Sequence, residues 1–425
     1  MGMLRRITAS VIRIAFVSGL VLLPTAALAQ TTVKWMHLEV NPSQIKIWEE
    51  VAREFEGKNP GVKIEMQFLE NEAYKAKLPT LLQSKDRPHI IYSWAGGVLK
   101  SQVEAGVLED ITASLAGYKD NLSPAAVAAF TFDGKTYGVP FAQSQTGFFY
   151  NKELMAKGGV DGSKIKTWDD LLDAVKKLKA AGVTPLMTGG ADKWPLHFFW
   201  TNLAVRIGGK TGFDAALKGE NGGFEAETFL KSGVLFKQLV DLQPFQNGFL
   251  GFKNPQAVGA FGDAKAAMML GISSFYNTQR SLSADKKGIS DDNLGWFDFP
   301  VVPGGRGEPT DTLGGINGWL VTKGAPKEAV EFVKSFVSLD VQKRLAAPGF
   351  IVPVYKGADE ALASPFMRNI AQNLAKSKYH QNFYDQSLGP NVGRVVNDAS
   401  AEIAGGTMTP EQASKSIQAA YKQGN

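Results

Sequence analysis

The chain contains no cysteine and only four histidines among its 425 residues. The absence of cysteine excludes disulfide bonds, thiolate catalysis and cysteine zinc sites, and it also excludes a lipid anchor on an N-terminal cysteine. The histidines are scattered, and no two have the helical spacing of a metal-binding pair. We therefore predict neither a metal site nor a cofactor.

Long hydrophobic runs are also missing. After residue 29, no stretch reaches the roughly 20 apolar residues of a membrane-spanning helix. In residues 1–29, three arginines precede or enter the apolar run Ile14–Leu23, which is followed by Pro24 and by Ala27-Leu28-Ala29. This is the layout of a secretory signal peptide cleaved near Ala29. We expect an exported protein that diffuses freely in a periplasm.

The chain has little excess of charge of either sign. Its formal charge is +5, and the three arginines of the N-terminal segment contribute three of these charges, which leaves +2 for the remainder. No run of clustered lysine and arginine is present. We therefore expect no nucleic-acid partner.

Enzyme signatures are absent as well. Gly208-Gly209-Lys210-Thr211 resembles the end of a phosphate-binding loop, but that motif requires a glycine where Ala204 stands. No zinc-protease helix motif, calcium-binding loop or nucleophile elbow is found. Glu39 and Asp385 are the carboxylates that a glycosidase would require, although carboxylates equally serve as acceptors for ligand hydroxyls. We predict no catalytic residue.

The chain has 44% hydrophobic residues, enough for more than one compact core, so two lobes are expected. After the N-terminal segment, residues 32–38 and 62–68 read as strands, and the apolar face of residues 42–57 predicts a helix between them. A strand–helix–strand opening indicates a parallel sheet whose working loops follow the carboxyl ends of its strands.

The stretch Val139–Lys152 is the segment on which the predicted arrangement of the two lobes depends. It follows the Asp133-Gly134 turn signal and places small and polar residues between two apolar blocks. We interpret it as the strand that passes from the first lobe to the second, with Ser144 and Gln145 facing a cleft. An ordinary buried strand with polar ends is the alternative.

Aromatic and polar residues recur at predicted loop positions. Flat rings cover the apolar faces of a pyranose, and carboxylates and amides bond its hydroxyls, so this mixture is typical of a carbohydrate site. Trp35, Trp48 and Trp168 lie on periodic faces or in a first helical turn and are assigned to the core. The candidate ligand-binding residues are His37, Glu39, Asn41, Trp94, Ser144, Gln145, Trp194, His197, Ser273, Phe275, Tyr276, Asn317, Trp319 and Asp385.

Several motifs in order resemble one family over essentially the whole chain after residue 29. They are NPGVKIEMQ, PHIIYSWAGG with AGVLEDIT, DGKTYGVPFAQSQTGFFYNKELM, TWDDLLDAVKKLKAAG, FGDAKAAMML with GISSFY, GGINGWLVTKGA, and YDQSLGPNVGRVVNDA with GTMTPEQA. The chain is similar to the extracellular solute-binding proteins of ATP-binding-cassette sugar importers, the group that includes maltose-binding protein.

The resemblance implies an α/β protein with the two-lobed periplasmic-binding-protein fold. Each lobe would be a mostly parallel sheet flanked by helices, and crossing strands would join the lobes around a ligand cleft. The expected first lobe comprises residues 30–140 and about 300–347, and the second comprises residues 141–299 and about 348–425. The apolar segment Phe297–Val302 is expected to begin the return to the first lobe. The implied partners are a carbohydrate and a membrane permease, and the implied state is a monomer.

By matching motifs, the resemblance places Glu39 and Trp94 in the first-lobe site and Trp194 and His197 in the second. Phe275 stands where maltose binders carry tryptophan, and this smaller platform argues against predicting maltodextrin as the ligand. We predict a periplasmic sugar-binding component of an importer without chemistry of its own. The alternatives are the same role for a polyol or another polar solute, and a secreted glycan-cleaving enzyme.

Overall fold

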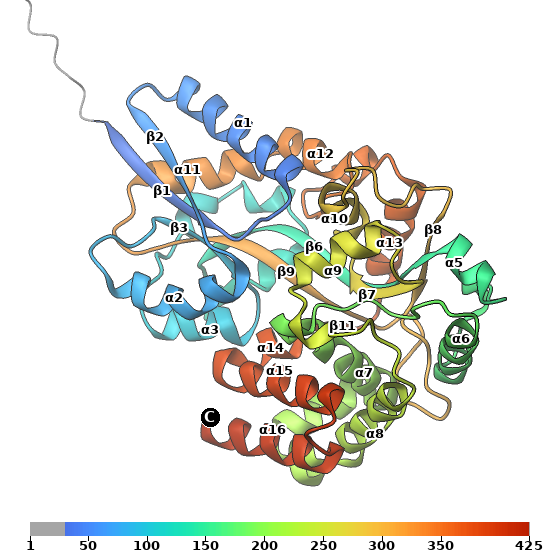
Figure 1. Cartoon of the computed structure of the whole chain (residues 1–425). Helices are drawn as coiled ribbons and strands as arrows, with labels where there is room; N and C mark the ends of the chain where they lie inside the picture. Colours follow the sequence, from blue (N-terminus) through green and yellow to red (C-terminus); the bar gives the residue numbers. More distant parts are fainter. Residues whose placement is uncertain (1–29, 425) are drawn as a thin grey trace, which may run out of the picture.

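The structure is a computed structural model that describes residues 30–424. The predicted signal peptide lies outside these residues. The chain forms two lobes of helices packed on β-strands, with strand β6 running through both (Figure 1). The elements of the first lobe are β1 (Thr31–His37), α1 (Pro42–Lys58), β2 (Val62–Phe68), α2 (Asn71–Gln83), β3 (Ile90–Trp94), α3 (Gly97–Glu104), α4 (Pro124–Ala128), β4 (Thr131–Phe132), β5 (Lys135–Thr136), α11 (Lys327–Phe336) and α12 (Leu339–Ala346).

The second lobe is the larger in helical content. Its elements are α5 (Lys152–Lys157), α6 (Trp168–Ala180), α7 (Trp194–Leu217), α8 (Glu227–Asp241), α9 (Asn254–Gly262), β7 (Met268–Ile272), α10 (Phe275–Leu282), β8 (Leu294–Asp298), α13 (Pro365–Lys376), β11 (His380–Asn382), α14 (Tyr384–Ser387), α15 (Gly389–Gly405) and α16 (Pro410–Gly424). The strands that connect the lobes are β6 (Gly138–Asn151), β9 (Thr312–Val321) and β10 (Val352–Pro353).

The central sheet has the strand order β10-β6-β9-β3-β1-β2 and is mixed rather than mostly parallel. The opening β1–β2 and β1–β3 pairs are parallel, as predicted. β9 is antiparallel to both β3 and β6, and β7 and β8 are antiparallel to β6. The difference arises because β6 carries the chain out of the first lobe and β9 returns it, so the two strands must run in opposite directions.

β6 is the predicted crossing strand. Residues 138–145 pair with β9, and residues 146–151 pair with β7 and β8 of the second lobe. The Asp133-Gly134 turn closes the β4–β5 hairpin just before it. A single strand therefore contributes backbone hydrogen bonds to both lobes, which fixes their relative position at the crossing point.

The first-lobe core is built around an aromatic cluster. Trp35 of β1 lies 5.4 Å from Trp48 and 5.1 Å from Trp319, measured between ring centroids, and Trp319 stacks on Phe141 at 5.0 Å. Phe336 of α11 closes the cluster 5.2 Å from Trp35. In Figure 1, α1, α11 and α12 lie along one face of this sheet and α2 and α3 lie on the other. The periodic tryptophans assigned to the core from sequence are indeed buried.

The second-lobe core begins where β6 leaves the first lobe. Phe148 stacks on Phe297 with centroids 5.0 Å apart, and Phe299 stacks on Trp168 at 5.8 Å. The segment Phe297–Val302 therefore belongs to the second lobe, and the prediction that it returns to the first was wrong. The apolar side chains of Phe297, Phe299 and Val302 pack in the second-lobe core beside those of β6. The return follows at β9, and first-lobe core residues continue as far as Val354.

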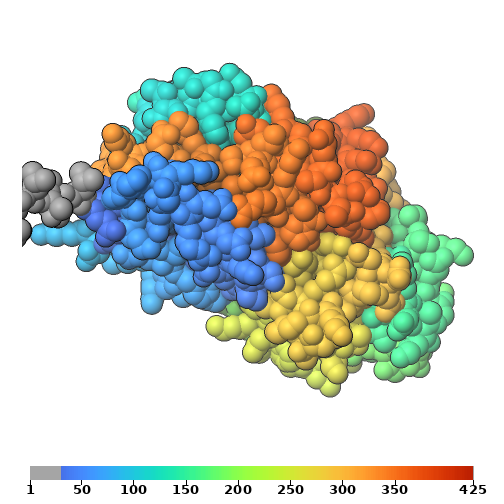
Figure 2. Space-filling view, turned by 90° about the horizontal axis from the view of Figure 1, so that it is seen from above, coloured from blue at the N-terminus to red at the C-terminus, as the bar shows by residue number. Residues whose placement is uncertain are grey.

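The two lobes are in contact on both sides of the space between them. In Figure 2 the blue surface of the β1–α1 region meets the yellow surface of the α9–α10 region, where the Asn41 Nδ2 donates to the Asn277 Oδ1 at 3.3 Å. On the other side, the start of α3 packs against α14 and α15. A Cβ atom on Gly97 would lie 2.4 Å from the backbone nitrogen of Gly389, so no side chain fits at this contact. The structure is therefore a closed one.

Gly314 on β9 tests how tightly the crossing strands pack. A Cβ atom there would lie 1.8 Å from the backbone oxygen of Ser144, so Gly314→Ala must force the strands apart. We expect a loss of about 1–3 kcal/mol in the free energy of unfolding, measured by urea denaturation. Gly57→Ala in α1 is the matched control, because nothing lies within 4 Å of its added Cβ. Equal stabilities of the two variants would contradict this account of the crossing.

Candidate functional site

A cavity of about 200 Å³ lies between the lobes. The first lobe lines it with the loop after β1, the start of α2 and the end of β3. The second lobe lines it with the starts of α7, α9 and α10 and with α14, and the middle of β6 forms its floor between them. The cavity therefore lies at the carboxyl ends of β1 and β3, where the parallel opening of the chain predicts the working loops.

Glu39 lies in the loop after β1. Its Oε1 atom accepts hydrogen bonds from the backbone N–H groups of Val40 and Asn41 at 3.0 and 2.8 Å. Burial raises the pKa of Glu39, and the two N–H groups partly offset this by stabilising the ionised form. The loop thus holds one carboxylate oxygen of Glu39 in place at the cavity lining.

Trp94 ends β3 and pairs with Asn317 of β9, so the neighbouring strand fixes its backbone. The ring makes edge contacts with Tyr92 at 5.2 Å and Tyr74 at 6.1 Å, and Lys75 Nζ lies 5.6 Å from its centroid. These neighbours restrict the ring, and the side chain remains partly exposed at the cavity wall. Trp94 is thereby held as a flat surface for a ligand.

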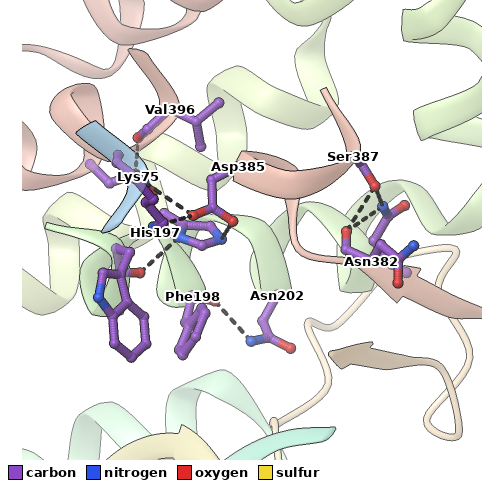
Figure 3. Close-up of polar contacts among 12 residues, drawn as sticks. Lys75, His197, Phe198, Asn202, Asn382, Asp385, Ser387 and Val396 are labelled. Carbon is purple, nitrogen blue, oxygen red and sulfur yellow. Dashed lines mark hydrogen bonds and ion pairs between the residues drawn. The ribbon is translucent and has the colours of Figure 1, made fainter. Parts of the chain in front are cut away.

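Asp385 of α14 occupies the centre of a polar cluster that bridges the lobes (Figure 3). Its Oδ2 accepts from Asn397 Nδ2 at 3.2 Å and lies 3.8 Å from Nζ of Lys75, which belongs to α2 of the first lobe. Its Oδ1 lies 3.8 Å from His197 Nε2. The Lys75–Asp385 pair is a charged contact across the cleft.

His197 is fully buried at the start of α7, and burial lowers its pKa despite the neighbouring carboxylate of Asp385. The ring is therefore neutral near pH 7. Its Nδ1 lies 2.7 Å from the carbonyl oxygen of Trp194, a geometry that assigns the proton to Nδ1. His197 Nε2 is then an acceptor, and it has no hydrogen-bond partner among the described residues. Nε2 lies beside the side chains of Asp385 and Asn397.

The second-lobe wall is aromatic. Trp194 contacts Phe198 edge-on at 5.4 Å, and Phe198 stacks on Phe383 at 4.8 Å. Phe275 adds a further ring from α10. The Nε1 atom of Trp194 is buried and has no hydrogen-bond partner within residues 30–424. Flat apolar surfaces thus flank the cavity on the side opposite Trp94.

The structure brings a majority of the sequence-predicted site residues to the cavity. The predicted residues that line it are Glu39, Trp94, Ser144, Trp194, His197, Phe275, Asn317 and Asp385. The predicted residues that lie away from the lining are His37, Asn41, Gln145, Ser273, Tyr276 and Trp319. Whether the first group contacts a ligand stays a prediction.

The residues away from the cavity have structural partners instead. Trp319 lies in the first-lobe aromatic cluster, and Gln145 Nε2 donates to Asp298 Oδ1 at 2.8 Å. Asn41 caps α1 by accepting from the Ser43 N–H at 3.0 Å. Tyr276 stacks on a phenylalanine ring and donates to Asp291 Oδ1 at 2.9 Å. Ser273 is fully buried, and its backbone N–H donates to the carbonyl oxygen of Gln145.

His37 also lies away from the cavity, although it ends β1 only two residues before Glu39. Strand alternation directs its ring into the core, where it lies 5.4 Å from Trp48 and 5.7 Å from Phe68. Ser144 does reach the cavity, but its hydroxyl is engaged with the backbone of Gly315, donating at 3.3 Å and accepting at 3.1 Å. Ser144 therefore contributes surface to the cavity wall, while its hydroxyl is engaged with the backbone of Gly315.

Several lining residues were missed by the sequence reasoning. Glu70 and Asn71 directly follow β2, so the rule that selected Glu39 after β1 also applies to them. Asp192 lies in the loop before α7, where its Oδ2 accepts from the Asn254 N–H at 2.6 Å. Lys75 lies one turn into a helix and gives no sequence signal. Its role depends on the approach of the second lobe.

The family model for bacterial extracellular solute-binding proteins matches residues 41–343. The chain belongs to this family. This confirms the family predicted from the motifs. Among the residues that the structure describes, no helix combines the length and the apolar character needed to cross a membrane. The same residues hold no cluster of side chains suited to a metal ion.

Curated relatives of this solute-binding protein include transporter components. It is 30% identical over 183 residues to an uncharacterized ABC transporter extracellular-binding protein of Pyrococcus horikoshii, an alignment that spans 42% of each chain. It is 25% identical to the sn-glycerol-3-phosphate-binding periplasmic protein of Brucella abortus over 94% of this chain and 93% of the relative. The first of these relatives is thus matched over less than half of its length.

Solved structures of similar fold cover almost the whole solute-binding protein. A protein from work on xylan utilization by Caldanaerobius polysaccharolyticus has a TM-score of 0.84 and 28% identity over 91% of this chain and 99% of its own. A chitin oligosaccharide binding protein has a TM-score of 0.85 and 26% identity over 93% of this chain and 98% of its own. The two-lobed α/β architecture is thereby confirmed.

The buried position of His37 predicts how stability depends on pH. Burial lowers the pKa of His37 from 6.5 to about 4, so between these values the unfolded chain binds a proton that the folded chain does not. The free energy of unfolding should therefore fall as the pH drops through this window, by about 1.4 kcal/mol per pH unit for each such histidine. His380 behaves in the same way. Urea denaturation across this range should show a shallower slope for His37→Phe, and identical slopes for the two proteins would contradict the assignment.

Proposed function

We propose that this protein captures a sugar or oligosaccharide in the periplasm and delivers it to an ABC permease. The observation that carries the proposal is the arrangement of the cavity wall. Trp94 of the first lobe and the Trp194–Phe198 wall of the second lie on opposite sides of a cavity whose polar groups include carboxylates and amides. Rings on two sides and hydrogen-bonding groups at the edges match the apolar faces and hydroxyl rim of a pyranose.

The comparisons support the sugar assignment without identifying the sugar. Two solved structures above 25% identity concern xylan utilization and chitin oligosaccharides, and both align over nearly the full chain. We infer that the ligand is held by groups from both lobes, so that binding favours the closed arrangement by differential affinity. The lobes must separate to admit a ligand, because the closed lobes contact each other on both sides of the cavity. The protein is proposed to act as a monomer.

A glycan-cleaving role has less support. Glu39 and Asp385 both line the cavity, but Asp385 is engaged with Asn397 and lies close to Lys75. The carboxylates are accounted for as hydrogen-bond acceptors and as partners of the interlobe lysine. We therefore propose binding without catalysis, and a sugar recovered chemically unchanged after incubation is the expected result.

Trp94 is the residue whose removal should affect sugar binding with the smallest effect on folding. We expect Trp94→Ala to weaken the affinity about threefold to tenfold, which matches the roughly 0.5–1.5 kcal/mol of an aromatic stacking contact. Calorimetry with the sugar found by a thermal-shift screen of mono- and oligosaccharides measures this change. Phe132→Ala is the matched control, because Phe132 belongs to the same lobe and lies outside the cavity lining. An unchanged affinity in Trp94→Ala would remove Trp94 from the site.

A further inference from the structure

The charges around the cavity are strongly unbalanced. Four carboxylates line it, contributed by Glu39, Glu70, Asp192 and Asp385, whereas Lys75 is the single lysine or arginine in the lining formed by the described residues. The Lys75 ammonium is already engaged, with Nζ 3.3 Å from Glu72 Oε1 and 3.8 Å from Asp385 Oδ2. The remaining carboxylates have no cation of their own within the lining.

The buried polar atoms add to this excess of acceptors. His197 Nε2, Asn254 Oδ1 and Gln386 Oε1 belong to lining residues that are more than nine-tenths buried, and each lacks a hydrogen-bond partner in the described chain. All three atoms are acceptors. Among the buried, unpartnered atoms of the lining in the described residues, the Trp194 N–H is the one donor. An unsatisfied buried polar group costs about 1–3 kcal/mol, so a ligand rich in donors gains the most from this cavity.

Glu70 and Asp192 are the two carboxylates between which a positively charged group of the ligand would lie. Glu70 belongs to the first lobe and Asp192 to the second, and both line the cavity. Burial raises the pKa of Asp192 most, the charge of Glu70 raises it further, and the charges of Lys253 and Lys75 partly offset this. Asp192 is 7% exposed, and its Oδ2 is fixed by the Asn254 N–H at 2.6 Å. Closure brings two like charges together, and a cation between them removes this repulsion.

We propose that the cavity selects a carbohydrate bearing a protonated amine, and that Glu70 and Asp192 hold the ammonium group between the two lobes. This inference rests on the proposed sugar-binding function and specifies its ligand class. An ammonium group offers three donors and no acceptor, which complements the excess of acceptors. A phosphorylated ligand would instead bring acceptors and negative charge to a cavity that already has both in excess. We therefore infer a specificity different from that of the glycerol-phosphate-binding relative.

The test compares ligands that differ at one substituent. Calorimetry in slightly acidic, low-salt buffer measures binding of glucosamine oligosaccharides, of their N-acetylated counterparts of equal length, and of glucose 6-phosphate. We expect the amine form to bind at least about tenfold more tightly than the acetylated form, a difference of about 1.4 kcal/mol, and the phosphate to show no binding. Added salt should reduce the preference, because it screens a charge interaction.

Two charge-removing variants locate the ammonium group. Asp192→Asn and Glu70→Gln keep an acceptor oxygen at each position, and each should remove most of the amine preference while retaining binding of the acetylated form. Asp173→Asn, an exposed position on α6, is the matched control and should keep the full preference. Thermal midpoints of the ligand-free variants show whether each one is folded. If one cavity variant does not fold, the other alone still tests the amine preference.

The outcomes separate the inference from the function on which it rests. Equal binding of the amine and acetylated forms, or a preference that survives in both cavity variants, would overturn the ammonium site and leave sugar binding intact. Binding of the linear diamine putrescine with no binding of any sugar would overturn the sugar-binding function itself. Tighter binding of the amine that both variants abolish would establish the proposed site.

Discussion

The structure depends on the backbone pairing of β6, a single strand that belongs to both lobes. Its first residues are bonded to β9 and its last residues to β7 and β8, so the lobes share a continuous ladder of hydrogen bonds rather than a flexible linker. Gly314 and Ser144 approach closely at the crossing, where no side chain larger than hydrogen fits. The crossing therefore fixes the lobes to each other at this point, and the cavity residues that lie farther from it reach their relative positions when the lobes close.

The electrostatics of the cavity follow from that geometry. Acidic side chains that would be harmless on separate surfaces are brought together when the lobes meet, and Lys75 is the lysine that reaches across to Asp385. The same lysine lies over the ring of Trp94, so an entering sugar must displace it or share the ring with it.

Sequence reasoning was most reliable where a local rule decides the outcome. The strand–helix–strand opening over residues 32–68 and the Asp133-Gly134 turn depend on neighbours in the chain, and both were predicted. It was less reliable where partners are distant. Trp319 was assigned to the site from its nearby glycines, but the rings of Trp35 and Phe141 hold it in the core. Lys75 and Asp192 could not be recognised, because their significance arises only when two segments more than a hundred residues apart meet.

The contact between Gly97 and Gly389 has a consequence for how binding strength is set. With no side chain on either residue, the edges of the two lobes come together at backbone distance. A methyl group at this point would act as a wedge remote from the ligand, leaving every cavity residue intact while lowering the fraction of molecules able to close. Apparent affinity would fall in proportion to that fraction. Affinity in this protein is thus adjustable at the rim, independently of the chemistry that recognises the ligand.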